Sequence, residues 1–152
     1  MSRFARVLAA LGLVSMLGLG VVSATTADPS QSLISSMDAI PTGGLTINGV
    51  IGGGAPWVIN QGTAILTGDG HLVVRVNGLV LASNHTNPVA NGRAIVTCNG
   101  QAPITTDSVP FSPAGNAFVA TTIRMPSPCL APTVFFAAVT GAGDRWLAVT
   151  GL

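Results

Sequence analysis

Residues 63–82 read TAILTGDGHLVVRVNGLVLA, and this stretch decides the fold. Its apolar side chains alternate after the glycines, so that Leu72, Val74 and Val76 share one face of an extended strand. The Gly68-Asp69-Gly70 segment can supply the positive φ angles of a tight hairpin turn. The stretch therefore predicts two antiparallel strands, each with one buried face and one solvated face.

The Asn77-Gly78 pair in the same stretch has two interpretations. Between apolar runs it is typical of a β-hairpin turn. It can also form a bulge in one long strand that changes sheet. We favour the bulge, because the turn at Gly68–Gly70 has just reversed the chain and the arms of a second hairpin would be short.

Similar short apolar runs, separated by Gly, Asn, Asp and Pro, continue along the chain and predict further strands. The expected strands are Leu45–Ile51, Trp57–Asn60 with Thr63–Leu66, Leu72–Ala82, Arg93–Asn99, Ala117–Met125, Thr133–Thr140 and Trp146–Thr150. In Ala117–Met125, Val119, Thr121, Ile123 and Met125 share one face. No window holds a helical period, so helical crossovers and a parallel sheet are not expected. We predict an all-β fold, an antiparallel two-sheet sandwich of immunoglobulin-like size, with a small closed barrel as the alternative.

Composition supports this fold class and restricts the partners. The chain has 152 residues, of which 48 % are hydrophobic and only 7 % charged, which fits one domain with its own core. It contains neither lysine nor glutamate, two good surface helix formers. The formal net charge is +1, and the arginines are scattered, so no basic surface for nucleic acid is expected.

The N-terminus resembles a secretory signal peptide. Arg3 and Arg6 precede an uncharged apolar run over 7–22, and small residues allow cleavage after Ala24 or Ala27. The alternative is an uncleaved anchor, but the run is shorter than the roughly 20 residues that span a bilayer. We therefore predict a signal peptide over 1–27, an irregular leader over 28–44 with at most a weak helical turn near Ser32–Ala39, and one domain over 45–152. The mature protein is expected to be secreted, with no membrane span.

The two cysteines, Cys98 and Cys129, predict one disulfide in an exported chain. A metal site would need further ligands at short spacing, and a catalytic thiol would need a histidine partner. Cys129 lies among the prolines of 126–132, which cannot form a central strand. We expect the bridge to tie this connection to the end of the Arg93–Asn99 strand.

Several segments carry a resemblance. GGGAPWVIN (52–60), LVVRVNGLVLA (72–82), NPV (87–89), AIVTC (94–98), PSPCLAPTVFF (126–136) and WLAVTG (146–151) look like those of an uncharacterised group of small secreted bacterial proteins. The likeness covers most of the mature chain and rests on Gly, Pro, Cys and apolar residues. It implies a secreted β domain with one disulfide and carries over no activity.

Candidate functional residues are few. Asp69 and His71 flank the predicted hairpin tip, where an aspartate could orient an imidazole. Asn84 and His85 lie in a polar loop and belong to an N-glycosylation acceptor pattern. The alternative for both pairs is a solvated turn without a functional role.

Other recognised sites are not supported by the sequence. No G-x-S-x-G nucleophile motif, paired carboxylates, or calcium-binding D-x-D pattern is present. Gly52–Gly54 lacks the Lys-Ser/Thr of a phosphate loop, and a glycine bulge or loop is expected there. Both tryptophans, Trp57 and Trp146, are expected in the core. No cofactor or metal is predicted.

Three function classes remain. The expected one is a non-catalytic extracellular β module that binds a partner or contributes to an envelope or surface assembly. The second is a small enzyme that uses His71 or His85. The third is an inhibitor or ligand carrier. A rigid exposed loop such as 83–92 would favour recognition, whereas a histidine bonded to an acid and a serine would favour catalysis.

Overall fold

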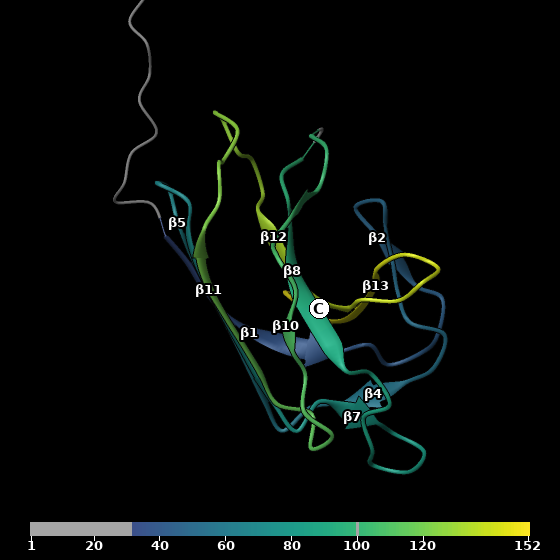
Figure 1. Cartoon of the computed structure of the whole chain (residues 1–152). Coiled ribbons are helices and arrows are strands. Elements are labelled where there is room, and N and C mark those ends of the chain that lie inside the picture. Colours follow the sequence, from purple (N-terminus) through teal and green to yellow (C-terminus); the bar gives the residue numbers. More distant parts are fainter. Residues whose placement is uncertain (1–31, 100) are drawn as a thin grey trace, which may run out of the picture.

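The computed structural model describes residues 32–99 and 101–152, and this part of the chain is all-β (Figure 1). The predicted signal segment, 1–27, and the first residues of the leader lie outside it. The strands are β1 Ser32–Ala39, β2 Thr46–Ile47, β3 Val50–Ile51, β4 Trp57–Val58, β5 Gln61–Thr67, β6 His71–Asn77, β7 Val80–Leu81, β8 Asn91–Thr97, β9 Ile104–Thr105, β10 Val109–Pro110, β11 Ala117–Thr122, β12 Thr133–Ala138 and β13 Arg145–Thr150. All pairs between these strands are antiparallel, as predicted.

Nine strands form one curled sheet in the order β10-β8-β12-β13-β1-β5-β6-β11, with β9 beside β8. The half that contains β8, β12 and β13 folds over the half that contains β5, β6 and β11 (Figure 1). Apolar side chains fill the space between the two halves. Hydrogen bonding is continuous through β1, which pairs with β5 at Ser32–Ser36 and with β13 at Met37–Ala39. The architecture is therefore an antiparallel sheet curled into a half-barrel.

Strand β1 corrects the prediction for the leader. Residues 32–39 were expected to be irregular or weakly helical, yet they form an eight-residue strand in the middle of the sheet. Serine has no strong preference for strands, and the local sequence gave no strand signal. Partners on both sides stabilise the strand, and its inward face carries Leu33 and Met37 into the core. Tertiary pairing thus overrides local propensity.

The predicted strand Leu45–Ile51 is also different in the structure. It is a small hairpin, in which β2 and β3 are joined by Asn48 and Gly49 at φ 49° and 79°. Positive φ at both central residues is the requirement of the tight turn that Asn-Gly pairs favour. The Asn48 amide donates to the hydroxyls of Thr97 and Thr133, each at 3.2 Å, and so attaches the hairpin to β8 and β12.

At Asn77-Gly78 the chain changes partners and does not fold back on itself. Strand β6 pairs with β5 and β11, whereas β7 pairs with β4 in a separate two-stranded ladder. Gly78 has a φ of 63°, which produces the change of direction. Of the two interpretations of this pair, the structure excludes the hairpin.

The predicted faces of the long strands are confirmed. Leu72, Val74 and Val76 are buried, and so are Val119 on β11 and Ile123 just past its end. Trp57 and Trp146 both belong to the core, as expected. The Trp146 indole N–H donates to the Leu45 carbonyl at 3.1 Å, so that its one polar atom is satisfied.

Cys98 and Cys129 form the predicted disulfide. Cys98 directly follows β8, and Cys129 lies in the proline-rich connection before β12. Beside the bridge, the Asn99 N–H donates to the Leu130 carbonyl at 2.8 Å. The bridge therefore holds this connection against the end of β8, next to the point where Thr97 pairs with Thr133.

The Gly52–Gly54 run packs against the core. Gly52 forms a bridge with Trp146, and Gly53 N–H donates to the Trp146 carbonyl at 2.9 Å. A Cβ on Gly52 would lie 2.5 Å from Ile40 Cδ1 and 2.7 Å from the Leu45 carbonyl oxygen. Glycine is needed here for close approach of the backbone to the core.

Candidate functional site

Asp69 and His71 come together at the β5–β6 hairpin, but as parts of the turn. The Asp69 carboxylate accepts hydrogen bonds from the Thr67 hydroxyl and from the His71 backbone N–H. These two hydrogen bonds, that of Thr67 above all, hold the pKa of Asp69 below its ordinary value. In the part of the chain that the structure describes, no hydrogen bond joins the carboxylate to the His71 ring. The geometry supports a turn and no catalytic dyad.

Asn84 and His85 also have local roles. The Asn84 side-chain oxygen accepts from the Thr86 N–H at 3.1 Å and from the Thr86 hydroxyl at 2.8 Å. His85 has a φ of 53° and donates its backbone N–H to the Leu81 carbonyl at 2.9 Å. Both side chains are exposed. This arrangement closes a turn after β7.

The structure does not bring the two histidines into one site. His71 begins β6, and the chain runs the length of that strand before it reaches the loop of His85. At about 3.3 Å per residue, the strand alone separates its ends by about 20 Å. The histidine-based enzyme site that the sequence allowed is therefore not assembled from both residues.

The loop after β7 is held from within by Asn87, a residue that no recognised functional motif contains. Asn87 is 8 % exposed, and its side-chain amide donates to the carbonyls of Val89 and Ser112, both at 2.8 Å. Its side-chain oxygen accepts from the Val89 N–H at 2.9 Å. A buried amide with its hydrogen bonds satisfied fixes two loops relative to each other. The Asn-Pro-Val segment, 87–89, was the available sequence signal.

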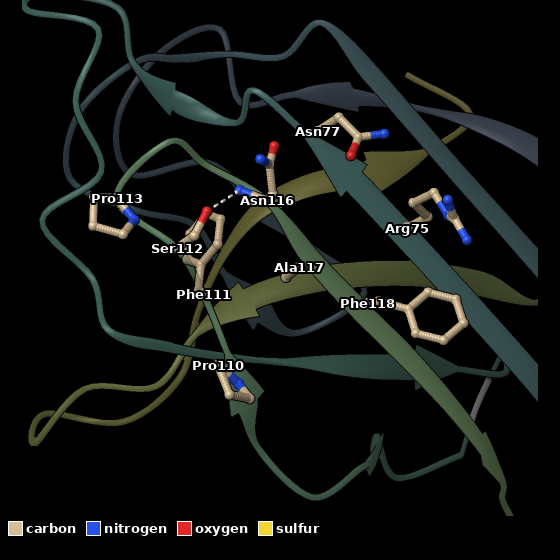
Figure 2. A pocket seen from close by; sticks show the side chains of 9 residues that line it. All are labelled: Arg75, Asn77, Pro110, Phe111, Ser112, Pro113, Asn116, Ala117 and Phe118. Atoms are coloured by element: carbon tan, nitrogen blue, oxygen red, sulfur yellow. Dashed lines mark hydrogen bonds between the residues drawn. The ribbon is translucent and has the colours of Figure 1, made fainter.

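The second of these loops, 111–116, joins β10 to β11. Asn116 accepts the Gly78 N–H at 3.0 Å through its side chain, and its own N–H donates to the Ser112 hydroxyl at 3.0 Å (Figure 2). The Leu79 N–H donates to the Gly115 carbonyl at 2.9 Å. The loop is thus bound to the segment that leaves β6, and its polar groups are held in place.

A groove of about 710 Å³ opens where the 111–116 loop meets β6 and β11 (Figure 2). We call it the binding groove; it is lined by Arg75, Asn77, Pro110, Phe111, Ser112, Pro113, Asn116, Ala117 and Phe118. Phe111 and Ala117 belong to the core and form an apolar part of the lining. Pro110, Pro113 and Phe118 add further apolar surface, and guanidinium, amide and hydroxyl groups come from Arg75, Asn77, Asn116 and Ser112. Such a mixture of apolar lining and few fixed polar groups is typical of a recognition site.

Arg75 and Phe118 form the most distinctive contact of the groove. They are register partners on β6 and β11, and the Arg75 guanidinium carbon lies 5.1 Å from the centre of the Phe118 ring. Phe118 is 50 % exposed. Among residues 32–99 and 101–152, Arg75 makes no ion pair, since the salt bridge found there joins Arg93 to Asp144. The Phe118 ring therefore holds the Arg75 guanidinium in a position where it is available to an anionic partner.

The described residues contain no group of three or more His, Cys, Asp or Glu that could hold a metal ion. No helix among them has the length and apolar character needed to cross a membrane. Comparison of the chain with protein-family models, with curated proteins and with solved structures found no match.

Proposed function

We propose that the chain is an exported, non-catalytic β-sandwich module that binds an extracellular or cell-surface partner through the binding groove. The observation that carries the proposal is the Arg75–Phe118 pair: a cation that makes no ion pair within the described ranges is stacked on a half-exposed ring at the side of a groove with fixed walls. Arginine is enriched among the residues that dominate binding energy, and phenylalanine and arginine are both enriched at the centre of protein interfaces.

The absence of catalysis is supported by the local roles of the candidate residues. Asp69 and Asn84 use their side chains to close turns, and His71 and His85 are solvated. The groove itself contains no histidine or carboxylate. Its open form, beside the 111–116 loop, favours recognition of a partner surface over enclosure of a small ligand.

Export and the two-layer description are parts of the same proposal. The Cys98–Cys129 bridge is compatible with an oxidising compartment, and the N-terminal pattern of charge, apolar run and small residues supports secretion. The two halves of the curled sheet face each other across one core, which supports the sandwich description. The resemblance to small secreted bacterial β proteins points in the same direction.

The test is binding of the fluorescently labelled, purified protein to intact cells of its own organism. We expect saturable binding that unlabelled protein displaces. Arg75→Gln and Phe118→Ala should each weaken it about tenfold or more, the usual effect of removing an important contact residue. Arg124→Gln is the matched control, because Arg124 is exposed and does not line the groove. Binding that is equal in all four proteins would contradict the assignment of the groove.

A further inference from the structure

Strand β11 ends the sheet with an open edge. It pairs with β6 along all six of its residues and has no second strand partner in the described part of the chain. Ile123 N–H, just past the strand, donates to the Gly70 carbonyl at 2.9 Å, and these two positions continue the β6–β11 register. In an antiparallel ladder the backbone groups of alternate residues point to opposite sides. The N–H and C=O groups of Phe118, Ala120 and Thr122 therefore point away from β6, along the open edge.

The two ends of the sheet differ in how they resist strand addition. At the far end, β9 and β10 are two residues long, Asp107 lies between them, and Pro110 lacks a backbone donor. Short edge strands, charges and proline are the usual protection of an edge. Strand β11, AFVATT, has six residues and contains no charge and no proline. It is the unprotected edge, and such an edge can accept another strand.

The binding groove lies at the N-terminal end of this edge. Ala117 and Phe118 line it, and β10 contacts β11 at the same place, so that the open seam closes there. A strand that runs along β11 toward the groove must therefore end near Phe118. An antiparallel strand would bring its C-terminus to this point, and a parallel one its N-terminus. Arg75 has no ion-pair partner in the part of the chain that the structure describes, and its positive charge favours the carboxylate over the ammonium group.

We propose that β11 and the binding groove together capture the C-terminal segment of a partner protein, which adds as an antiparallel strand and presents its terminal carboxylate to Arg75. This inference rests on the proposed function and names the class of its partner. The strand supplies the backbone donors and acceptors that Phe118, Ala120 and Thr122 lack. Ala120 ends a row of apolar or small outward-facing residues, Ile34, Ile65, Val73 and Ala120, so the partner residue opposite Ala120 is expected to be apolar.

The experiment uses two synthetic peptides, acetyl-Thr-Thr-Val-Thr-Val with a free C-terminal carboxylate and the same peptide with a C-terminal amide. Each is titrated into isotopically labelled full-length secreted protein, and backbone amide signals are followed by NMR. We expect the acid form to shift the amide signals of Phe118, Ala120 and Thr122 and to bind about tenfold more tightly than the amide form. In Arg75→Gln this difference should disappear, while Arg124→Gln should retain it.

Ala120→Pro tests the strand addition directly. Its backbone N–H is one that β6 does not use, so proline removes a donor of the open edge and leaves the β6–β11 ladder intact. We expect both peptides to lose binding, while Ala120→Ser retains it. Thr122→Pro removes the next free donor and serves the same purpose if Ala120→Pro does not fold.

Three outcomes would overturn the proposal. The first is the absence of any amide shift with either peptide at millimolar concentration, and the second is equal binding of the acid and amide forms. The third is a concentration-dependent dimer that Ala120→Pro abolishes, because this result would assign the edge to a second copy of the chain. Cell binding that depends on Arg75 but is unchanged in Ala120→Pro would refute strand addition while the proposed function stands. Peptide binding without cell binding would refute the proposed cell-surface partner while strand addition at β11 stands.

Discussion

The side-chain amide of Asn87 donates a hydrogen bond to the Ser112 carbonyl at 2.8 Å, across a sequence separation of 25 residues. The same amide bonds Val89 through both its nitrogen and its oxygen. One buried side chain thus joins the loop after β7 to the loop that forms a wall of the binding groove. This relationship gives the first prediction.

Asn87→Ala should destabilise the protein by about 2–3 kcal/mol, because it leaves buried backbone groups without partners. The free energy of unfolding from chemical denaturation measures this loss. Asn84→Ala is the control, since Asn84 is exposed and bonds only its own turn. A loss for Asn87→Ala no larger than that of the control would refute the assigned role.

Gly52→Ala should cost stability of about 1–3 kcal/mol, because the added methyl group would collide with Ile40 and with the Leu45 backbone. Gly54→Ala is the matched control, because nothing lies within 4 Å of the position of its Cβ. Thermal unfolding of both variants decides the matter. A melting temperature for Gly52→Ala equal to that of Gly54→Ala would show that the core yields at this point.

We expect every secreted molecule of this protein to contain the disulfide. Thiol titration of the denatured, unreduced chain should therefore find no free thiol. The bridge closes a loop over a sequence separation of 31 residues, for which the chain-entropy model gives about 3.5–4 kcal/mol. Replacement of both cysteines by alanine should therefore lower the melting temperature by roughly 10–20 °C. The far-UV circular dichroism spectrum should persist, because the β8–β12 ladder next to the bridge does not depend on it.

Asp69 should contribute a pH-dependent part of the stability. Its pKa is lower in the folded protein, chiefly through the Thr67 hydroxyl and then the His71 N–H, so the ionised form is the one that the fold favours. This contribution is present above the ordinary pKa of aspartate and is lost as the pH falls through the lower folded value. Asp69→Asn should flatten that part of the stability curve, measured by denaturant unfolding from neutral to acidic pH. An identical acid dependence in both proteins would rule out the turn as its source.

His71→Ala and His85→Asn should leave the fold and cell binding unchanged, because neither imidazole belongs to an assembled site. Asparagine is chosen at position 85 because it tolerates the left-handed backbone found there. The measurements are the melting temperature and the cell-binding curve. An enzymatic turnover that either substitution abolishes would contradict the non-catalytic proposal.

The sequence by itself determined the fold class, most strands and the inward faces of the long ones. This was possible because alternation along β6 and β11 is a local property, and so are the turn preferences of Gly68–Gly70. The disulfide could also be predicted, because the sequence contains two cysteines, Cys98 and Cys129, which can pair only with each other within the chain.

Only the tertiary structure decided how the strands are ordered and what meets at the edges. The central position of β1 depends on partners that lie far along the chain, since its serine-rich sequence has little preference for a strand. Arg75 and Phe118 become neighbours through the register of β6 against β11, which no local pattern specifies. The candidate site was missed for the same reason: an exposed ring, a cation and an open edge acquire meaning only when long-range pairing fixes which backbone groups and side chains remain without a partner.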